Sequence, residues 1–379
     1  MRLLFRTRYS GIVGGAEAYA SRAATALREL GHVVDVVYDE ATPDRTPVDA
    51  HARPLSEAPQ VPYDAALLHH LGPTTEAQLG RAAAYYVHDY VGTCATGSKT
   101  HARLGFATCE RRFGTGCLAA NYPLGCGARD PRTLVRLLRK RYGERERMGR
   151  AGRLLVASRH MHDHLVREGF APRRLRVVQP ALLPPDAELR DAPPPPSPLV
   201  ILFLGRLTEL KGPGTLLEAA RLLHGDTGAS IALHYAGSGP AEAKLRASAA
   251  AAPFPVRFLG WIDAAGRREA LRASHVLALP SLWPEPYGLV GLEAAAHGVP
   301  TVAFDRGGIR QWLRHRESGL LVPDVGPEGM ARALGEALLD ETRYAHLRAG
   351  ALRSAEQRTP RRGGQALANA LAELAEETA

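Results

Sequence analysis

The sequence predicts an α/β fold made of two Rossmann-like domains, each with a doubly wound parallel sheet. Three observations predict it: the chain length, two series of short apolar runs that alternate with helical patterns, and a proline-rich stretch between the series. A single hydrophobic core rarely grows beyond about 250 residues. A chain of 379 residues is therefore expected to form two domains.

The first series begins as a βαβ unit. Strands are predicted at residues 2–6 and 33–38, with a glycine-rich turn at residues 10–15 and apolar residues at helical spacing over residues 16–30. Strands joined by such a crossover helix run parallel. Further strands of this sheet are predicted at residues 65–69, 83–87, 154–157 and 175–178.

The boundary between the domains is predicted at residues 192–198, which read APPPPSP and cannot form a helix or a central strand. We expect a first domain at residues 1–191 and a second at 199–355. A final helix at 356–379 is expected to pack back on the first domain. Strands of the second domain are predicted at residues 199–204, 231–235, 256–259, 276–279, 301–304 and 319–322.

Composition restricts the class of protein. Hydrophobic residues make up 45% and charged residues 23%, a soluble globular profile. No apolar run approaches the ~20 residues of a membrane-spanning helix, and the first residues are too short for a signal-peptide core. We expect a cytoplasmic protein, with peripheral contact at the inner membrane face as a further expectation. The net charge of +9 favours anionic partners without choosing among them.

Two cations lie where a phosphate is expected to bind. Arg206 and Lys211 belong to the loop GRLTELKG, which begins at Gly205 and connects a buried strand to a helix. Such a loop exposes backbone N–H groups and the positive end of a helix dipole. The loop therefore predicts a diphosphate clamp, although two cations on an ordinary surface loop would give the same pattern.

Two carboxylates follow in the segment WPEPYGLVGLEAAAHGVP. Glu285 lies on a proline-rich loop and Glu293 lies eight residues further on, inside the next helix. Gly288 lets the backbone approach a ligand closely at the helix start. We expect the carboxylates to accept hydrogen bonds from vicinal hydroxyls. The alternative is that either glutamate is solvated or balances the helix dipole.

Together these motifs resemble the retaining glycosyltransferases of the GT-B fold, in particular glycosyltransferase family 4 (glycosyl transferases group 1). The resemblance rests on GRLTELKG, EPYGLVGLEA and the N-terminal GGAE, and it covers essentially the whole chain. GSGP, FLGW and the pair Gly307 and Gly308 fall in the family's order. It implies two Rossmann-like domains facing each other across a cleft.

The resemblance implies a role for each matching position. Arg206 and Lys211 match the diphosphate-binding cations, Glu285 the donor-sugar glutamate and Glu293 the ribose glutamate. The catalytic set is His88, Glu285, Arg206 and Lys211. The donor-binding set is Gly14, Gly15, Gly205, Arg206, Lys211, Gly237, Gly239, Trp261, Ile262, Glu285, Tyr287, Gly288, Leu289 and Glu293.

His88 follows a strand run at a carboxyl end, where a sugar-orienting group is expected, and its position matches the family's cleft histidine. A lone histidine is more often structural. Asp89 is expected either to fix its tautomer or to cap a turn, and His69 and His70 to line the cleft. One departure from the family is that Gly307 and Gly308 lead to Ile309 and Arg310 instead of a glutamate.

A second departure is a cysteine-rich insert at residues 92–129, which contains all four cysteines of the chain: Cys94, Cys109, Cys117 and Cys126. In a reducing cytoplasm, clustered thiols favour a structural zinc site, or less readily an iron–sulfur cluster, over disulfides. The spacings lack the tight C-x2-C knuckles of familiar zinc sites. Metal, unligated thiols and disulfides all remain open.

Residues 132–153 are dense in arginine and predict a basic amphipathic helix, which is either a peripheral membrane contact or a solvated face.

The predicted function is transfer of a hexose from a UDP- or GDP-sugar to the hydroxyl of a saccharide, lipid-linked or small-molecule acceptor, with retention at the anomeric carbon and no cofactor. A sugar-nucleotide epimerase of the same fold is one alternative. A non-enzymatic metal or nucleic-acid binding protein is another, and nucleic acid is disfavoured because aromatic and basic residues are not interleaved.

Overall fold

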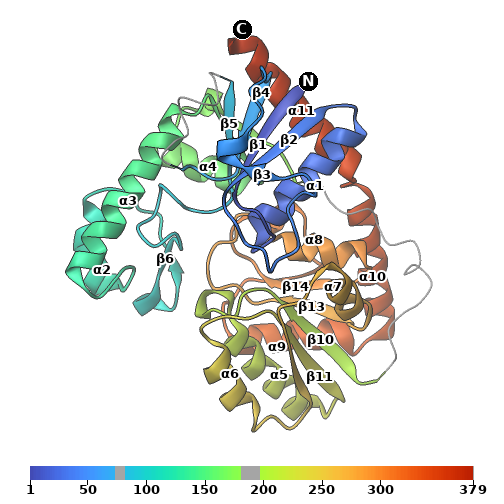
Figure 1. Ribbon diagram of the computed structural model, residues 1–379. Coiled ribbons are helices and arrows are strands. Elements are labelled where there is room, and N and C mark those ends of the chain that lie inside the picture. The colour runs from blue at the N-terminus through green and yellow to red at the C-terminus, as the bar shows by residue number, and fades with distance from the viewer. Residues whose placement is uncertain (73–81, 181–196, 379) are drawn as a thin grey trace. The chain divides into compact units, whose positions relative to one another are not determined.

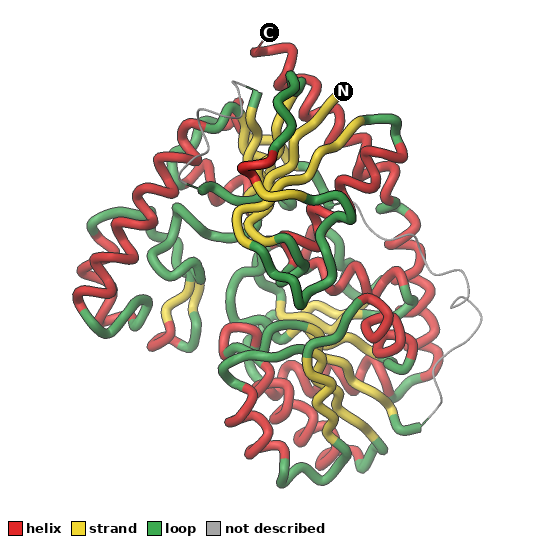
Figure 2. Tube along the Cα trace, in the orientation of Figure 1, coloured by secondary structure: helices red, strands yellow, loops and turns green. Residues whose placement is uncertain are grey.

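The computed structural model describes residues 1–72, 82–180 and 197–378. The chain divides into two compact units. The first unit comprises Met1–Leu182 and Arg358–Ala379, and the second comprises Leu183–Gln357. Residues 192–196 of the predicted linker lie outside the described residues. Helices pack around the strands of each unit (Figure 2).

The first unit contains a parallel seven-stranded sheet with the order β3-β2-β1-β4-β5-β8-β9. The chain leaves β1 in one direction toward β2 and later returns to its other side with β4, so the strand order reverses there. All six strands predicted for this half are present, and β3 is an additional short one. The strands are β1 (Arg2–Tyr9), β2 (Val33–Glu40), β3 (Arg53–Pro54), β4 (Ala65–Leu68), β5 (Ala83–Val87), β8 (Arg153–Val156) and β9 (Leu175–Val177).

Among the described residues, five α-helices belong to the first unit. The last of them, at the C-terminus, packs against α1 and closes the first unit (Figure 1). Gly364 makes the approach close, because a Cβ there would lie 3.1 Å from Cβ of Ala26. The helices are α1 (Gly15–Glu29), α2 (Gly116–Leu124), α3 (Pro131–Arg150), α4 (Arg159–Arg167) and α11 (Pro360–Thr378).

The predicted basic helix ends earlier than expected. It stops at Arg150, and Arg153 lies in β8 with its side chain 2% exposed. The guanidinium of Arg153 pairs with Glu373 at 2.9 Å and with Glu377 at 2.5 Å, both on α11. Arg153 is therefore a buried internal ion-pair residue and no part of a basic surface.

The cysteine-rich insert connects β5 to α3. It contains an antiparallel ribbon of β6 (Thr100–His101) and β7 (Ala107–Thr108), followed by α2. A small apolar cluster of Ala95, Phe113, Leu134 and Leu138 joins it to α3.

The second unit contains a parallel six-stranded sheet with the order β12-β11-β10-β13-β14-β15. Its order reverses between β10 and β13, and all six strands were predicted. The strands are β10 (Leu199–Leu204), β11 (Ile231–Ala236), β12 (Val256–Gly260), β13 (Val276–Leu279), β14 (Thr301–Phe304) and β15 (Gly319–Val322). The helices are α5 (Pro213–Thr227), α6 (Glu242–Ala249), α7 (Ala264–Arg272), α8 (Leu289–Ala296), α9 (Pro327–Leu338) and α10 (Glu341–Glu356).

The core of the second unit lies at its two central strands. Leu202 of β10 and Leu277 of β13 are fully buried and pack with Leu271 of α7 and Ala294 of α8. Strands buried on both faces read as continuous apolar runs, which is why β10 and β13 were recognisable. Within the described residues, no helix combines the length and the apolar character needed to cross a bilayer.

Candidate functional site

The loop after β10 is held in place by the loop after β11. The N–H of Gly205 donates to the carbonyl of Ala236 at 2.9 Å, and the N–H of Leu207 donates to that of Ser238 at 3.0 Å. A Cβ on Gly239 would lie 2.4 Å from the Leu207 carbonyl oxygen, and one on Gly237 would lie 1.9 Å from that of Gly205. These two glycines are therefore required for packing between the loops.

The same loop ends at the start of α5. Gly212 is the N-cap, with φ of 67°, and a Cβ there would lie 2.0 Å from the carbonyl oxygen of Pro280. Only glycine fits this left-handed and crowded position. Pro213 starts α5, whose first N–H groups have no intrahelical partners. Arg206 and Lys211 thus lie beside a helix N-terminus, an arrangement that attracts anions.

Lys211 and Glu285 form an ion pair. Nζ of Lys211 lies 2.6 Å from Oε1 of Glu285 and 4.9 Å from the centre of the Trp283 ring. The Ser281 hydroxyl donates to the same carboxylate oxygen at 2.5 Å. The side chain of Glu285 is 4% exposed and that of Lys211 is 29% exposed. The positive charge of Lys211 therefore compensates the negative charge of the buried Glu285 carboxylate.

Arg206 differs from Lys211. Its side chain is exposed, and within the described parts of the chain no hydrogen bond or ion pair engages its guanidinium. Its charge is therefore available to an incoming anion, whereas the charge of Lys211 is shared with Glu285.

The glycine pair after β14, Gly307 and Gly308, packs closely against the backbone of Glu285. The N–H of Gly308 donates to the Glu285 carbonyl at 2.6 Å. Gly307 has φ of 73°, and a Cβ on it would lie 2.2 Å from the same oxygen. Sequence reasoning noted these glycines but not this role. Arg310, which stands where the family often has a glutamate, is exposed and pairs with Asp305.

Glu293 lies in α8, whose N-cap Gly288 has φ of 84°. Its carboxylate is 5% exposed and pairs with Nη1 of Arg267, on α7, at 2.9 Å. Sequence reasoning missed Arg267, because the pair spans 26 positions and two helices. Any hydroxyl that binds Glu293 must share the carboxylate with this guanidinium.

Two aromatic candidates differ in exposure. Trp261, directly after β12, is 39% exposed and can offer a face to a nucleobase, with Ile262 half-buried beside it. Tyr287 is 3% exposed, and its carbonyl accepts a hydrogen bond from the Trp312 indole at 2.5 Å. Tyr287 is therefore a packing residue that fixes the backbone before Gly288 and Leu289.

The two cations and Glu285 follow the carboxyl ends of parallel strands. Arg206 and Lys211 follow β10 and Glu285 follows β13, the two strands between which the order reverses. Ligands of open parallel sheets bind at such switch points. The arrangement offers an exposed cation, a shared cation, a helix N-terminus and two buried carboxylates, and it suits a phosphorylated ligand that carries hydroxyl groups.

In the first unit, His88 follows β5 and His69 follows β4. Nδ1 of His69 lies 2.9 Å from Nε2 of His88. Burial lowers the pKa of His88 to about 3, and burial together with His88 lowers that of His69 well below its usual value. Both imidazoles are therefore neutral near pH 7, so one donates to the other.

The other candidate residues of the first unit make contacts of their own. Asp89 accepts a hydrogen bond from the N–H of Val91 at 2.7 Å, so it caps a turn. His70 lies 3.9 Å from Asp39. Gly14 caps α1, and its N–H donates to the Glu17 carboxylate at 3.1 Å, while Gly15 opens the helix.

The four cysteines line one cavity of about 20 Å³ in the insert. All four are free thiols. Among the described residues, no three or more histidine, cysteine or acidic side chains are already arranged as metal ligands.

Comparison with known proteins agrees with this architecture. Residues 186–353 match the family model Glycosyl transferases group 1. This segment contains every donor-site candidate of the second unit.

Curated relatives match part of the chain. The D-inositol 3-phosphate glycosyltransferase of Jonesia denitrificans is 34% identical over 233 residues, which are 54% of this chain and 53% of that protein. The phosphatidyl-myo-inositol mannosyltransferase of Mycobacterium leprae is 37% identical over 153 residues, 40% of each protein. The chain spans about half the length, or less, of these relatives.

Solved structures match almost the whole chain. Sucrose-phosphate synthase from Thermosynechococcus elongatus aligns with a TM-score of 0.72 and 18% identity, covering 99% of both chains. Anabaena HepE in complex with UDP-glucose aligns with a TM-score of 0.69 and 19% identity, covering 98% of this chain and 100% of that one. These similarities confirm the predicted fold, the GT-B architecture with two Rossmann-like sheets.

Proposed function

We propose that this protein is a retaining glycosyltransferase of family 4 that moves a hexose from a nucleoside diphosphate sugar to an acceptor hydroxyl. The observation that carries the proposal is the Lys211–Glu285 pair, which lies beside Arg206 and the start of α5 at the switch point of the second sheet. It joins a diphosphate-binding surface to a carboxylate that can bind sugar hydroxyls. The group 1 segment at residues 186–353 supports it.

The donor diphosphate binds Arg206, Lys211 and the N–H groups at the start of α5. Charge builds on the departing diphosphate in the transition state, and preorganised cations and helix dipoles stabilise it there. These groups do the work that Mg²⁺ or Mn²⁺ does elsewhere, so departure needs no metal. A metal at the four cysteines would be structural.

The rest of the donor contacts the second unit along the same sheet edge. Glu285 binds hydroxyls of the transferred sugar, Glu293 binds the ribose, and Trp261 and Ile262 border the base. HepE crystallised with UDP and with UDP-glucose, which supports a uridine donor, and a GDP-sugar is the second candidate.

His88 orients the sugar or the acceptor as a neutral imidazole. Its lowered pKa argues against general-base catalysis near pH 7, because a group with so low a pKa is a weak base. This agrees with the family's proposed front-face mechanism, in which the leaving phosphate helps take the acceptor proton.

The relatives named above act, by their names, on D-inositol 3-phosphate and on phosphatidyl-myo-inositol. They support an acceptor that carries a polyol and a phosphate, either free or lipid-linked. For a lipid-linked acceptor, α3 supplies the peripheral membrane contact, because its exposed face is rich in arginine.

The test has two steps. UDP- and GDP-sugars are first screened by thermal shift, and the stabilising donor is then assayed for release of nucleoside diphosphate with and without inositol phosphates and phosphatidylinositol vesicles. Release that depends on an acceptor, with a product of unchanged anomeric configuration by NMR, is expected. Conversion of the donor to its epimer without an acceptor would favour the epimerase, and no binding of any nucleotide sugar would refute the proposal.

A further inference from the structure

The cysteine-rich insert, residues 92–129, is not used by the proposed reaction. Its four cysteines are separated by 14, 7 and 8 residues, yet all four line one cavity. Cys94 precedes the β6–β7 ribbon and Cys109 follows it, whereas Cys117 lies in α2 and Cys126 just after it. The fold therefore brings thiols from two separate elements to one place.

The cavity has the size of one atom-sized ligand. Its volume is about 20 Å³, and a single water needs roughly 10–15 Å³ on such a measure. A buried water would also need two to four good hydrogen-bonding partners; the four thiols are weak partners, and the other lining residues include Thr100, His101 and Asn121. Four sulfurs around such a space form the ligand set of a tetrahedral thiolate zinc site, whereas a four-iron cluster would not fit.

Backbone N–H groups donate to two of the sulfurs. The N–H of Lys99 lies 3.4 Å from Sγ of Cys94, and a backbone hydrogen bond from Arg111 engages the thiol of Cys109. Such donors orient metal-bound thiolates.

A histidine beside the cysteines has an unsatisfied nitrogen. His101 lines the same cavity and is 8% exposed. Its Nδ1 is buried and has no hydrogen-bond partner in the described structure. Buried polar atoms are nearly always paired, so this nitrogen independently indicates that a polar or charged group belongs in the cavity.

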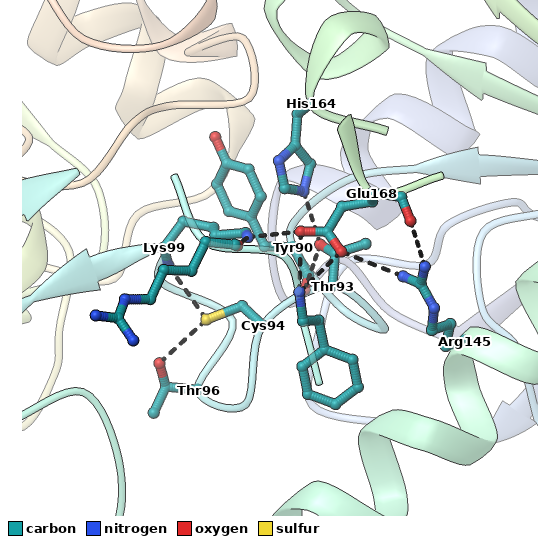
Figure 3. Close-up of polar contacts among 10 residues, drawn as sticks. Tyr90, Thr93, Cys94, Thr96, Lys99, Arg145, His164 and Glu168 are labelled. Carbon is teal, nitrogen blue, oxygen red and sulfur yellow. Dashed lines mark hydrogen bonds and ion pairs between the residues drawn. The ribbon is translucent and has the colours of Figure 1, made fainter. Parts of the chain in front are cut away.

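The side of the cavity that carries Cys94 and Cys109 is anchored to Glu168, at the end of α4. Nζ of Lys99 lies 2.7 Å from a Glu168 carboxylate oxygen, and both side chains are buried. It also donates to the carbonyl of Arg111 at 2.6 Å, and the N–H of Phe113 donates to Glu168 at 3.0 Å. Figure 3 shows Lys99 and Arg145 on either side of the Glu168 carboxylate. The backbone around Cys94 and Cys109 is thereby fixed against the end of α4.

The other side has weaker support. In the described structure, the α2 segment that carries Cys117 and Cys126 packs on a small apolar cluster whose buried members are Ala95, Phe113, Leu134 and Leu138. A metal bound by all four cysteines would join the ribbon to α2, and its binding energy would act directly as folding energy.

We propose that Cys94, Cys109, Cys117 and Cys126 bind one zinc ion as a structural tetrahedral site, with the sulfurs closing around this cavity. The segment begins just after His88, and it is anchored there by Thr93, whose hydroxyl lies 2.8 Å from Nε2 of His164. The zinc therefore orders the chain that follows His88 and takes no part in donor binding. This inference stands whether or not the proposed function is correct.

The experiment uses the full chain, purified without added metal. Elemental analysis is expected to give about one zinc per chain, with four thiols protected from iodoacetamide until a chelator is added. Chelation is expected to speed proteolysis within residues 92–129 without changing the affinity of the second unit for its nucleotide. Chelating the wild type keeps the test valid if cysteine variants fail to fold.

Variants then identify the ligands. Cys117→Ser is expected to lose the zinc, whereas Leu118→Ala, at an exposed neighbour on α2, is expected to keep it. Four reactive thiols without metal, two disulfides by mass spectrometry, or iron with sulfide would overturn the proposal. So would loss of zinc in His101→Gln with its retention in Cys117→Ser, because the ligand set would then be wrong.

Discussion

A buried carboxylate needs compensation, and Glu285 obtains it from a lysine 74 positions earlier in the chain. Lys211 is therefore expected to act in two ways: it stabilises the buried Glu285 carboxylate in the absence of ligand, and it binds the donor diphosphate. Arg206 is exposed and is expected only to bind the diphosphate. Two cations on one loop are therefore expected to behave differently when removed.

The first prediction concerns these cations. Arg206→Ala and Lys211→Ala should each cost about 2.7–4 kcal/mol of transition-state stabilisation, the order seen when one preorganised charge stabiliser is lost. Only Lys211→Ala should also lower Tm, because it leaves Glu285 buried with the Ser281 hydroxyl as its remaining side-chain partner among the described residues. Steady-state kinetics and thermal unfolding measure the two effects. Lys244→Ala, at an exposed lysine of α6, is the control, and near-normal turnover in both variants would contradict the clamp.

The second prediction separates the two glutamates. Glu293→Gln should chiefly raise KM for the donor, because ribose contacts change little during the reaction, whereas Glu285→Gln should chiefly lower kcat. Kinetics at varied donor concentration distinguish the cases. The reverse pattern would exchange the roles of the two residues.

The third prediction concerns pH. Burial lowers the pKa of His88 to about 3, of His160 to about 4 and of His164 to about 2. Between these values and about 6.5 the unfolded chain binds more protons than the folded one, so the free energy of unfolding must fall as the pH falls through this window. Urea unfolding at pH 7.5, 6 and 5 measures the slope. His164→Gln should flatten it, and an unchanged slope would show that His164 is not held neutral.

At the scale of elements, the sequence predicted best what depends on neighbours along the chain. The strands were recognisable from buried apolar runs, and Arg206 and Lys211 could be placed after a strand because Gly205, Gly212 and Pro213 mark the turn and the helix start. Contacts between residues that are distant in the sequence were not predictable in this way. Arg267 and Glu293 lie on two separate helices, and His69 and His88 follow two separate strands, so only the tertiary fold brings each pair together.

The fourth prediction tests the turn itself. Gly212→Ala must adopt a positive φ and would place Cβ against the Pro280 carbonyl, at a cost of about 1–3 kcal/mol for the backbone alone. Gly214→Ala, two residues later, meets open space within α5 and should be neutral or slightly stabilising. Thermal unfolding of both variants gives the comparison. Equal stability would mean that the loop relaxes without loss.

At the scale of the whole molecule, the chain returns to its first unit at the end. Arg358–Ala379 belong to the unit that starts at Met1, although a complete second unit lies between them. The two units have separate cores, so they can unfold in separate transitions. A donor that binds only the second unit should then raise only the transition of that unit.

The last prediction uses this separation. Arg153 is buried in β8, and Glu373 and Glu377 of α11 are its acidic partners. Replacing both glutamates by glutamine would leave a buried guanidinium without carboxylates, which can cost about 3–5 kcal/mol when the pair is well buried. The cost here should be smaller, because the side chains of Glu373 and Glu377 are 53% and 60% exposed and water screens them.

Calorimetry of Glu373→Gln/Glu377→Gln should therefore show a lower Tm for the first unit and an unchanged, nucleotide-responsive transition for the second. Glu376→Gln, an exposed glutamate on the same helix, is the matched control and should change neither transition. If both transitions shift together in the double variant, the two units unfold as one cooperative body, and α11 then stabilises the whole chain rather than the first unit alone.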